Sequence, residues 1–212
     1  MAEVKSGNRR AEKARETRRR MLEAARELFT EQGYGATTLQ DVAGRAGVAV
    51  QTIYFTFGNK RTLLKEVVDV VVAGDDEPVP TMERPWFLDA LAEPTAEGHL
   101  RAHVAGATAV LGRMAEIDEQ VRVACATDPE VAALWPTDPD PRLAVQQAAA
   151  EVLVGKPGIR PGVTAARAGD LLYGLLSTEL YLVLVRDRGW TPKSWERWVF
   201  ETLRAQLCGG DG

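Results

Sequence analysis

Residues 37–64 of the 212-residue chain read TTLQDVAGRAGVAVQTIYFTFGNKRTLL, and this stretch decides the fold. Thr38 and Asp41 have the spacing of a capping box, in which two side chains satisfy free backbone N–H groups at the start of a helix. Gly47 ends this first helix, and a second, short helix is predicted from about Val50 to Phe55. Two helices joined by a glycine turn have the geometry of a helix-turn-helix motif.

The second helix of such a motif enters the major groove of DNA, with its N-terminal residues facing base edges. Gln51 can pair with the N6/N7 edge of adenine, whereas Val50 or Thr52 can pack on a thymine methyl group. Gln40, at the start of the preceding helix, is a fourth candidate for base reading. The residues predicted to lie where phosphates pass are Tyr54, Thr56 and Lys60.

Helical patterns continue on both sides of this motif. A helix from about Glu12 to Gln32 carries an apolar stripe that includes Leu22, Ala25 and Phe29. Residues 1–10 are expected to form a mobile basic arm. Further helices are predicted over about 86–92, 97–115, 117–126, 129–135, 141–154, 164–186 and 192–207. No alternating pattern requires a strand, so the fold class is all-α.

The charge is distributed unevenly along the chain. Residues 1–73 hold 13 Lys and Arg against 9 Asp and Glu, whereas residues 74–212 hold 13 against 21. A basic head on an acidic body is the pattern expected when one end meets a polyanion. We divide the chain into a flexible basic arm and helix start over 1–17, a DNA-binding domain over 18–65 and a helical body over 66–212.

Several other classes of protein find little support. The longest apolar run, Leu171–Val185, has 15 residues and includes Glu179, so a membrane span is not expected. The N-terminus lacks the apolar run of a secretory signal, and the chain is expected in the cytoplasm. Cys125 and Cys208 are expected to be two free thiols. No phosphate-binding glycine loop, nucleophile elbow or HExxH motif occurs, so we expect no enzyme and no cofactor.

A helical hairpin with a glycine turn is a weak signal by itself, and specific residues favour a helix-turn-helix motif over a generic hairpin. They are Thr37 to Ala43, Gly47-Val48 and Ile53 to Leu64, together with Ala24-Ala25, Leu28-Phe29 and Gly33-Tyr34. This pattern, over about residues 18–65, resembles the TetR (tetracycline repressor) family. The resemblance implies an all-helical homodimer, with a three-helix head joined to a ligand-binding body. It also implies phosphate contacts for Thr38, Tyr54 and Lys60, a polar phosphate contact for Thr56, and base reading by Gln40, Val50, Gln51 and Thr52.

The body is expected to form the dimer. The predicted helix 164–186 is apolar on nearly all sides and must be buried from two directions, for which a partner subunit is a natural source. Two helices from each subunit would form a four-helix interface. The predicted interface residues are Leu172, Leu176, Leu180, Val183, Trp195 and Val199. A monomeric core around the same helix is the alternative.

An effector pocket is expected among the body helices. Its candidate lining residues are Trp86, Phe87, His103, Met114, Trp135 and Tyr173. Plain core packing is the alternative for each of them. His99 and His103 share one helix face, a spacing compatible with a metal pair, but no further ligand completes a motif, so we predict no metal site.

These observations predict a ligand-responsive regulator, expected to be a repressor, that binds a pseudo-palindromic operator in double-stranded DNA as a homodimer. Its partners would be the operator, a small-molecule effector and a second copy of itself. One alternative is a ligand sensor or partner adaptor that has lost specific DNA binding. A helical enzyme that uses His99 or His103 is another.

Overall fold

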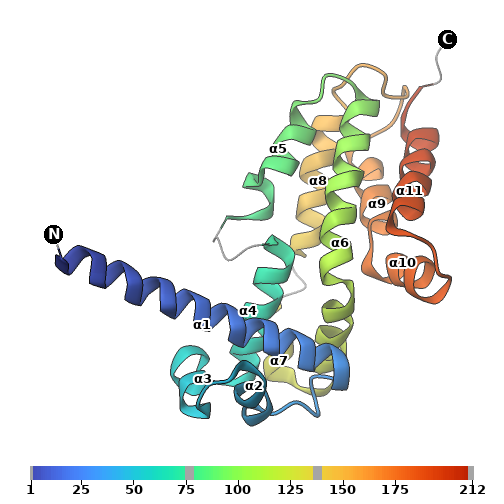
Figure 1. Ribbon diagram of the computed structural model, residues 1–212. Coiled ribbons are helices and arrows are strands. Elements are labelled where there is room, and N and C mark those ends of the chain that lie inside the picture. Colours follow the sequence, from blue (N-terminus) through green and yellow to red (C-terminus); the bar gives the residue numbers. More distant parts are fainter. Residues whose placement is uncertain (1, 75–78, 136–139, 210–212) are drawn as a thin grey trace. The chain divides into compact units, whose positions relative to one another are not determined.

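The computed structural model describes residues 2–74, 79–135 and 140–209 (Figure 1). Helices make up all the regular elements in these ranges, and the only β-type pairing there is an isolated antiparallel bridge between Ile159 and Cys208. The prediction of an all-α fold is confirmed.

The chain divides into two compact units. The N-terminal unit comprises Met1–Val70 and Glu116–Trp135, and the C-terminal unit comprises Val71–Ala115 and Pro136–Gly212. The helices of the first half are α1 (Ala2–Gln32), α2 (Leu39–Ala46), α3 (Val50–Phe57), α4 (Lys60–Ala73), η1 (Thr81–Glu83) and α5 (Pro85–Ala92). Those of the second half are α6 (Ala96–Thr127), α7 (Pro129–Ala132), α8 (Pro141–Leu153), α9 (Ala165–Leu175), α10 (Thr178–Tyr181), the π-helical η2 (Leu182–Asp187) and α11 (Pro192–Leu207).

The start of α2 and the turn after it have the local geometry that the sequence predicts. The N–H of Asp41 donates to Thr38 Oγ1 at 3.1 Å, and the N–H of Thr38 donates to Asp41 Oδ2 at 2.9 Å, which completes the capping box. Gly47 ends α2 in the left-handed region, with φ of 66°. A residue with a Cβ would be strained there, so the glycine fixes the turn between α2 and α3.

The helix α1 is longer than the sequence analysis predicts. It begins at Ala2 rather than near Glu12, so the segment assigned to an arm is its first part. Residues 2–11 contain Ala, Glu, Lys and Arg, which favour helices, and they contain no proline to stop one. Met21, Leu22, Ala25, Leu28 and Phe29 form its buried face, as the apolar stripe predicts.

The helix α6 is also continuous where a break near residue 116 is predicted. Residues 113–127 contain neither proline nor glycine, so nothing there interrupts the backbone hydrogen bonds. Its residues are divided between the units, because Ala96–Ala115 belong to the C-terminal unit and Glu116–Thr127 to the N-terminal unit.

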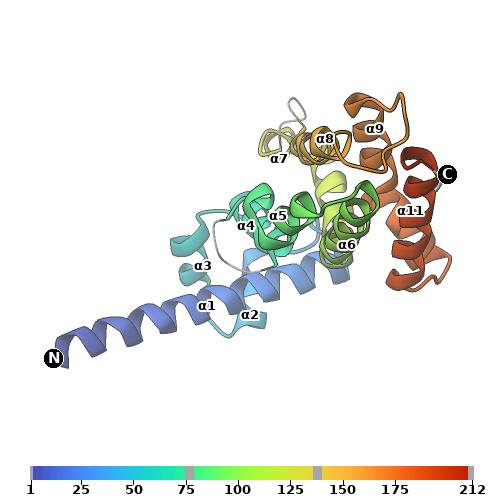
Figure 2. The same ribbon diagram turned by 90° about the horizontal axis from the view of Figure 1, so that it is seen from above.

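The C-terminal unit has its own apolar core, in which α8 and α9 lie side by side (Figure 2). The predicted helix 164–186 is divided here into α9, α10 and η2. Leu176 leaves the helical conformation, with ψ of 40°, and the Ser177 hydroxyl then caps α10 by accepting the Leu180 N–H. A serine placed to cap a new helix offers the backbone this alternative to a continuous helix.

No single helix within the described ranges is long and apolar enough to cross a membrane. The segments Ala165–Leu175 and Thr178–Asp187 satisfy the length and composition test only as a pair, bent by 42°. Leu172, Tyr181 and Leu182 of this pair are buried in the core of the C-terminal unit.

Candidate nucleic-acid interface

The helix α3 buries one face and exposes the other. Ile53 and Phe57, one helical turn apart, are buried in the N-terminal unit. Gln51, Tyr54 and Phe55 are exposed. Residues 46–59 contain no charged side chain, so this helix offers hydrogen-bonding and apolar groups rather than charges. Such groups can read base edges, whereas charges chiefly hold phosphates.

The other residues predicted to contact DNA lie at the start of α2, in α3 or at the start of α4. Gln40 is exposed in the first turn of α2, and Val50 and Thr52 are half-buried at the start of α3. The Thr38 hydroxyl takes part in the α2 cap, where it also donates to Asp41 Oδ2 at 2.6 Å. The Thr56 hydroxyl donates to the carbonyl of Thr52 at 2.8 Å.

Phe55 is the residue of this face that the sequence analysis missed. Its side chain is 93% exposed, which is unusual for a large apolar group. Helical spacing could have identified it, because Ile53 and Phe57 define the buried face and the residue between them points away. An exposed phenyl ring on a helix that reads DNA can pack on a thymine methyl group.

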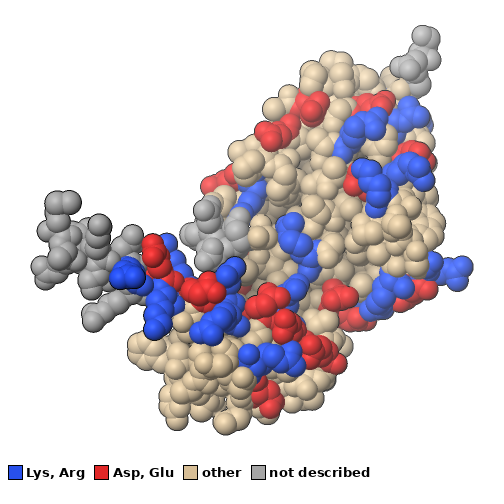
Figure 3. All heavy atoms as spheres, viewed as in Figure 1, with Lys and Arg blue, Asp and Glu red and all other residues tan. Residues whose placement is uncertain are grey.

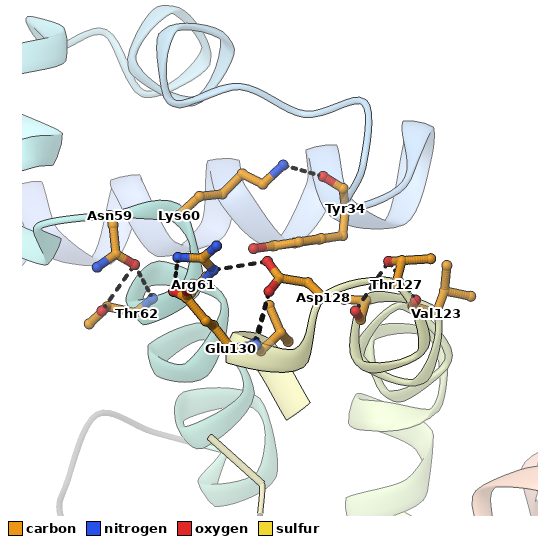
Figure 4. A network of polar contacts seen from close by, with 11 residues as sticks. Tyr34, Asn59, Lys60, Arg61, Thr62, Val123, Thr127, Asp128 and Glu130 are labelled. Carbon is orange, nitrogen blue, oxygen red and sulfur yellow. Dashed lines mark hydrogen bonds and ion pairs between the residues drawn. The ribbon is translucent and has the colours of Figure 1, made fainter. Parts of the chain in front are cut away.

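Lys60 does not point outward as a phosphate contact would. Its ammonium group donates to the carbonyl of Tyr34 at 2.6 Å (Figure 4). It also donates to the carbonyl of Thr37 at 2.9 Å. It also lies 4.1 Å from the centre of the Tyr34 ring. Desolvation lowers the pKa of this amine. In this conformation Lys60 joins the start of α4 to the connection between α1 and α2, so these hydrogen bonds occupy the ammonium group that the sequence predicts for a phosphate.

Arg61 links the start of α4 to the end of α6 and to α7 (Figure 4). Its guanidinium donates to Asp128 Oδ2 at 2.9 Å and also bonds the carboxylate of Glu130. This guanidinium holds the pKa of Asp128 below its usual value. Asp128 caps α7 at the same time by accepting the N–H groups of Glu130 and Val131. The N-terminal unit therefore contains a polar clasp between α4 and the junction of α6 with α7.

Basic side chains gather along α1, whereas the surface over α2 and α3 is largely uncharged (Figure 3). Lys13, Arg15, Arg19 and Arg20 are exposed on α1. Arg18 is instead paired with Glu66 of α4. An uncharged reading surface next to a basic helix suits DNA, because cations hold the phosphates while neutral groups meet the bases.

The residues predicted to line a pocket fall into two groups. Trp86, Phe87 and His103 lie together in the C-terminal unit, with ring centres 5.6 to 5.9 Å apart. The second group consists of Met114, Trp135 and Tyr173, which are not part of this cluster of rings. Trp135 belongs to the N-terminal unit, and the Tyr173 hydroxyl donates to Asp140 Oδ2 at 2.7 Å. The structure adds His99, whose ring centre is 6.0 Å from that of His103, and Gln146.

The residues predicted to form a dimer interface also divide into two groups. Leu172, Leu176, Trp195 and Val199 are at most 5% exposed within a single chain. They therefore pack in the chain's own core, and this burial favours the alternative of a monomeric core for these four residues. Leu180 is half-buried, and Val183 is 49% exposed.

Residues 21–67 match the family described as "Bacterial regulatory proteins, tetR family". TtgW of Pseudomonas putida, an uncharacterized HTH-type transcriptional regulator, is 33% identical over 100 residues, which are 41% of this chain and 72% of TtgW. The chain belongs to the TetR family. TtgR of the same species, an HTH-type transcriptional regulator, is 43% identical over 58 residues, or 27% of this chain. That match spans only 28% of the length of TtgR.

Solved structures of other regulators resemble this TetR-family chain in fold over most of its length, including the helical body. The regulator FadR from Bacillus subtilis, solved in complex with stearoyl-CoA, aligns with a TM-score of 0.64 at 19% identity. The alignment covers 87% of this chain and 96% of FadR. At this identity the likeness establishes the fold of both units and leaves the ligand open. The matched relatives are transcriptional regulators rather than enzymes. In the described ranges, no three His, Cys, Asp or Glu side chains are grouped to hold a metal ion.

Proposed function

We propose that this chain is a ligand-responsive transcriptional repressor that binds a pseudo-palindromic operator as a homodimer in the cytoplasm. The observation that carries the proposal is the exposed, uncharged face of α3, with Gln51, Tyr54 and Phe55 presented beside the basic α1. Membership of the TetR family agrees with it. A twofold dimer would place two recognition helices about 34–36 Å apart, or a multiple of that, on one side of the duplex.

Selection of duplexes from a randomised library by the purified full-length protein tests DNA binding directly. We expect enrichment of an inverted repeat, since each subunit would read one half-site. Genome-wide footprinting would then give the operator and the regulated genes together. Recovery of no preferred sequence would contradict the proposal and would favour a sensor without specific DNA binding.

The residues on the exposed face of α3 are proposed to have different roles in DNA binding. We propose that Gln51 reads a base by two hydrogen bonds, with Phe55 on a thymine methyl group and Tyr54 on a phosphate. Val50 and Thr52, at the start of α3, and Gln40, at the start of α2, would complete the contacts. Thr38 and Thr56 remain proposed as neighbours of the phosphate path.

Replacing Gln51 with Ala is expected to relax sequence preference at one base pair of each half-site by about 1–3 kcal/mol. The reason is the loss of a bidentate pair with a base edge. The preference is measured by repeating the library selection with the variant. Gln206→Ala, at another exposed glutamine, is the matched control and should leave the preference as it is. An unaltered preference in the Gln51 variant would remove that residue from base reading.

The dimer is proposed to form through the surface that contains Leu180 and Val183, at α10 and η2. This segment keeps exposed apolar area outside the core of its own unit. Large apolar groups on a surface are typical of interaction sites when they gather in a patch.

Val183→Glu is therefore expected to raise the dissociation constant of the dimer at least about tenfold, because it buries a charge in the contact. Analytical ultracentrifugation over a range of protein concentrations measures this constant. Val123→Glu, at a valine that is 54% exposed on α6, is the control and should leave the dimer intact. Equal dissociation constants for both variants would exclude the proposed surface.

A ligand would act by shifting the balance between two states of the dimer, by no more than its difference in affinity for them. The helix α6 has residues in both units, and its end is held to α4 by the pairing of Arg61 with Asp128 and Glu130. We propose that a ligand in the C-terminal unit changes α6 and that this clasp conveys the change to α4.

A further inference from the structure

Two fully buried histidines lie one turn apart on α6, and most of their nitrogens have no hydrogen-bond partner. His99 and His103 are both 0% exposed. Nδ1 and Nε2 of His99, and Nδ1 of His103, make no hydrogen bond within the described part of the chain. Buried polar atoms are nearly always hydrogen-bonded, so three such atoms in one place need an explanation. A molecule that supplies the missing partners from outside the chain is one.

Two aromatic rings of α5 lie against His103. Trp86 and Phe87 of α5 each have their ring centre 5.9 Å from that of His103. A Cβ at Gly106 would lie 2.1 Å from Cε3 of Trp86, so the glycine is what lets the indole ring lie directly on α6. Phe87 is buried, whereas Trp86 is only half-buried. Trp86 is thus the outermost member of the cluster.

The hydrogen bonds define what the site can accept. His103 Nε2 lies 2.8 Å from Gln146 Oε1, and an N–H at Nε2 that donates to this oxygen leaves Nδ1 as an acceptor. Nδ1 then requires a donor from the ligand, such as a hydroxyl or an N–H group. A carboxylate has no donor and cannot fill this role. His99, when neutral, offers one further donor and one further acceptor.

Charge is disfavoured at the same place. Burial lowers the pKa of both histidines, so both imidazoles are uncharged at neutral pH. The positive charge of Lys156 lies close enough to lower the pKa of His99 further, and its amine is held by the carbonyls of Leu91 and Glu93 at 2.8 and 2.5 Å. A cationic ligand would face this like charge, and any ion would lose its hydration.

We propose that His99 and His103, with Trp86, Phe87 and Gln146, form the effector site, and that it takes an uncharged aromatic molecule carrying a hydroxyl or N–H donor. The role of this molecule as effector rests on the proposed function, whereas its binding is independent of DNA. Flat rings suit contact with Trp86 and Phe87, and the donor satisfies His103 Nδ1.

Calorimetric titration of the full-length protein with three matched probes tests the site. The probes are 2-naphthol, naphthalene and 2-naphthoate, which share a ring system and differ in the donor and the charge. We expect 2-naphthol to bind at least about tenfold more tightly than either of the others, since the others leave a buried acceptor unpaired. A purely apolar pocket would instead favour naphthalene, the least polar probe.

Substitution of His103 identifies the acceptor. His103→Leu should bind 2-naphthol and naphthalene with similar affinity, whereas His103→Asn keeps an acceptor near Nδ1 and should retain part of the preference. Trp198→Phe, at another half-buried aromatic residue, is the control and should bind as the wild type does. If His103→Leu does not fold, the comparison of the three probes on the wild type still tests the proposed site.

Equal affinity of the wild type for 2-naphthol and naphthalene would overturn the site. So would an unchanged preference in a folded His103→Leu protein. Failure of all three probes to bind would overturn it too. Operator binding by the same preparation separates the two proposals. If the protein binds its operator but shows no preference for 2-naphthol, only the proposed effector site is refuted. If it prefers 2-naphthol but binds no operator, the site is supported and the proposed regulatory function is contradicted.

Discussion

Acidification from pH 7 to pH 4 is expected to lower the free energy of unfolding by about 3 kcal/mol through His99 alone. Burial lowers the pKa of His99 from 6.5 to about 4, and the charges of His103 and Lys156 act in the same direction. Between these two values the unfolded chain binds a proton that the folded chain does not. The free energy of unfolding that is linked to neutral His99 is therefore fully present above pH 6.5 and is lost as the pH falls toward 4.

Urea unfolding of the wild type and of His99→Leu at a series of pH values measures this contribution. The comparison is needed because carboxylates whose pKa is lowered, such as Asp41 and Asp128, also lose stabilising interactions in acid. We expect the variant to lose about 3 kcal/mol less than the wild type over this range. His103 has a lowered pKa as well and should contribute with the same sign. Parallel curves for the two proteins would contradict the prediction.

Replacement of Lys60 with Met is expected to destabilise the protein by about 3 kcal/mol. The variant keeps most of the aliphatic chain but leaves the carbonyls of Tyr34 and Thr37 without their charged donor. Because Lys60 also holds the start of α4 against the connection between α1 and α2, affinity for all DNA sequences should fall together. Urea unfolding gives the stability, and titration of a labelled operator gives the affinity.

The same variant separates a positioning role from a phosphate contact. A lysine that contacts a phosphate would lower the slope of log affinity against log salt by about one unit when it is removed. We expect the slope to stay unchanged for Lys60→Met. Lys65→Met is the matched control, because Lys65 makes a surface pair with Asp69 on the same helix and should cost under about 0.5 kcal/mol. A lower slope with unchanged stability would instead support the predicted phosphate contact of Lys60.

Local sequence signals predict the helix-turn-helix segment well. The capping box at Thr38 and Asp41, the turn at Gly47 and the bounds of α11 all follow from residues adjacent in sequence. Each depends on backbone conformation over a few residues, which caps and glycines determine directly. The exposed position of Phe55 could also have been predicted from helical spacing.

Contacts between distant residues could not be predicted in this way. Lys60 finds carbonyls that lie 26 and 23 residues earlier, and nothing in the local sequence distinguishes these from a phosphate. Leu172 and Trp195 are apolar enough for either a partner subunit or the chain's own core, and only the fold shows that they pack in the core. The break at Leu176 lies within an apolar run that contains no proline. His99 could be placed beside His103 by spacing, but the rings that contact His103 come from α5.

The helix α3 is supported at both ends by features outside its exposed face. Gly47 fixes the turn before it, and Gly58, with φ of 74°, ends it just before the start of α4, where Lys60 is anchored. Side chains at positions 51, 54 and 55 can therefore be exchanged while the backbone that carries them is kept. This makes the N-terminal unit a scaffold for engineered regulators, in which new target sequences are sought by varying three surface positions.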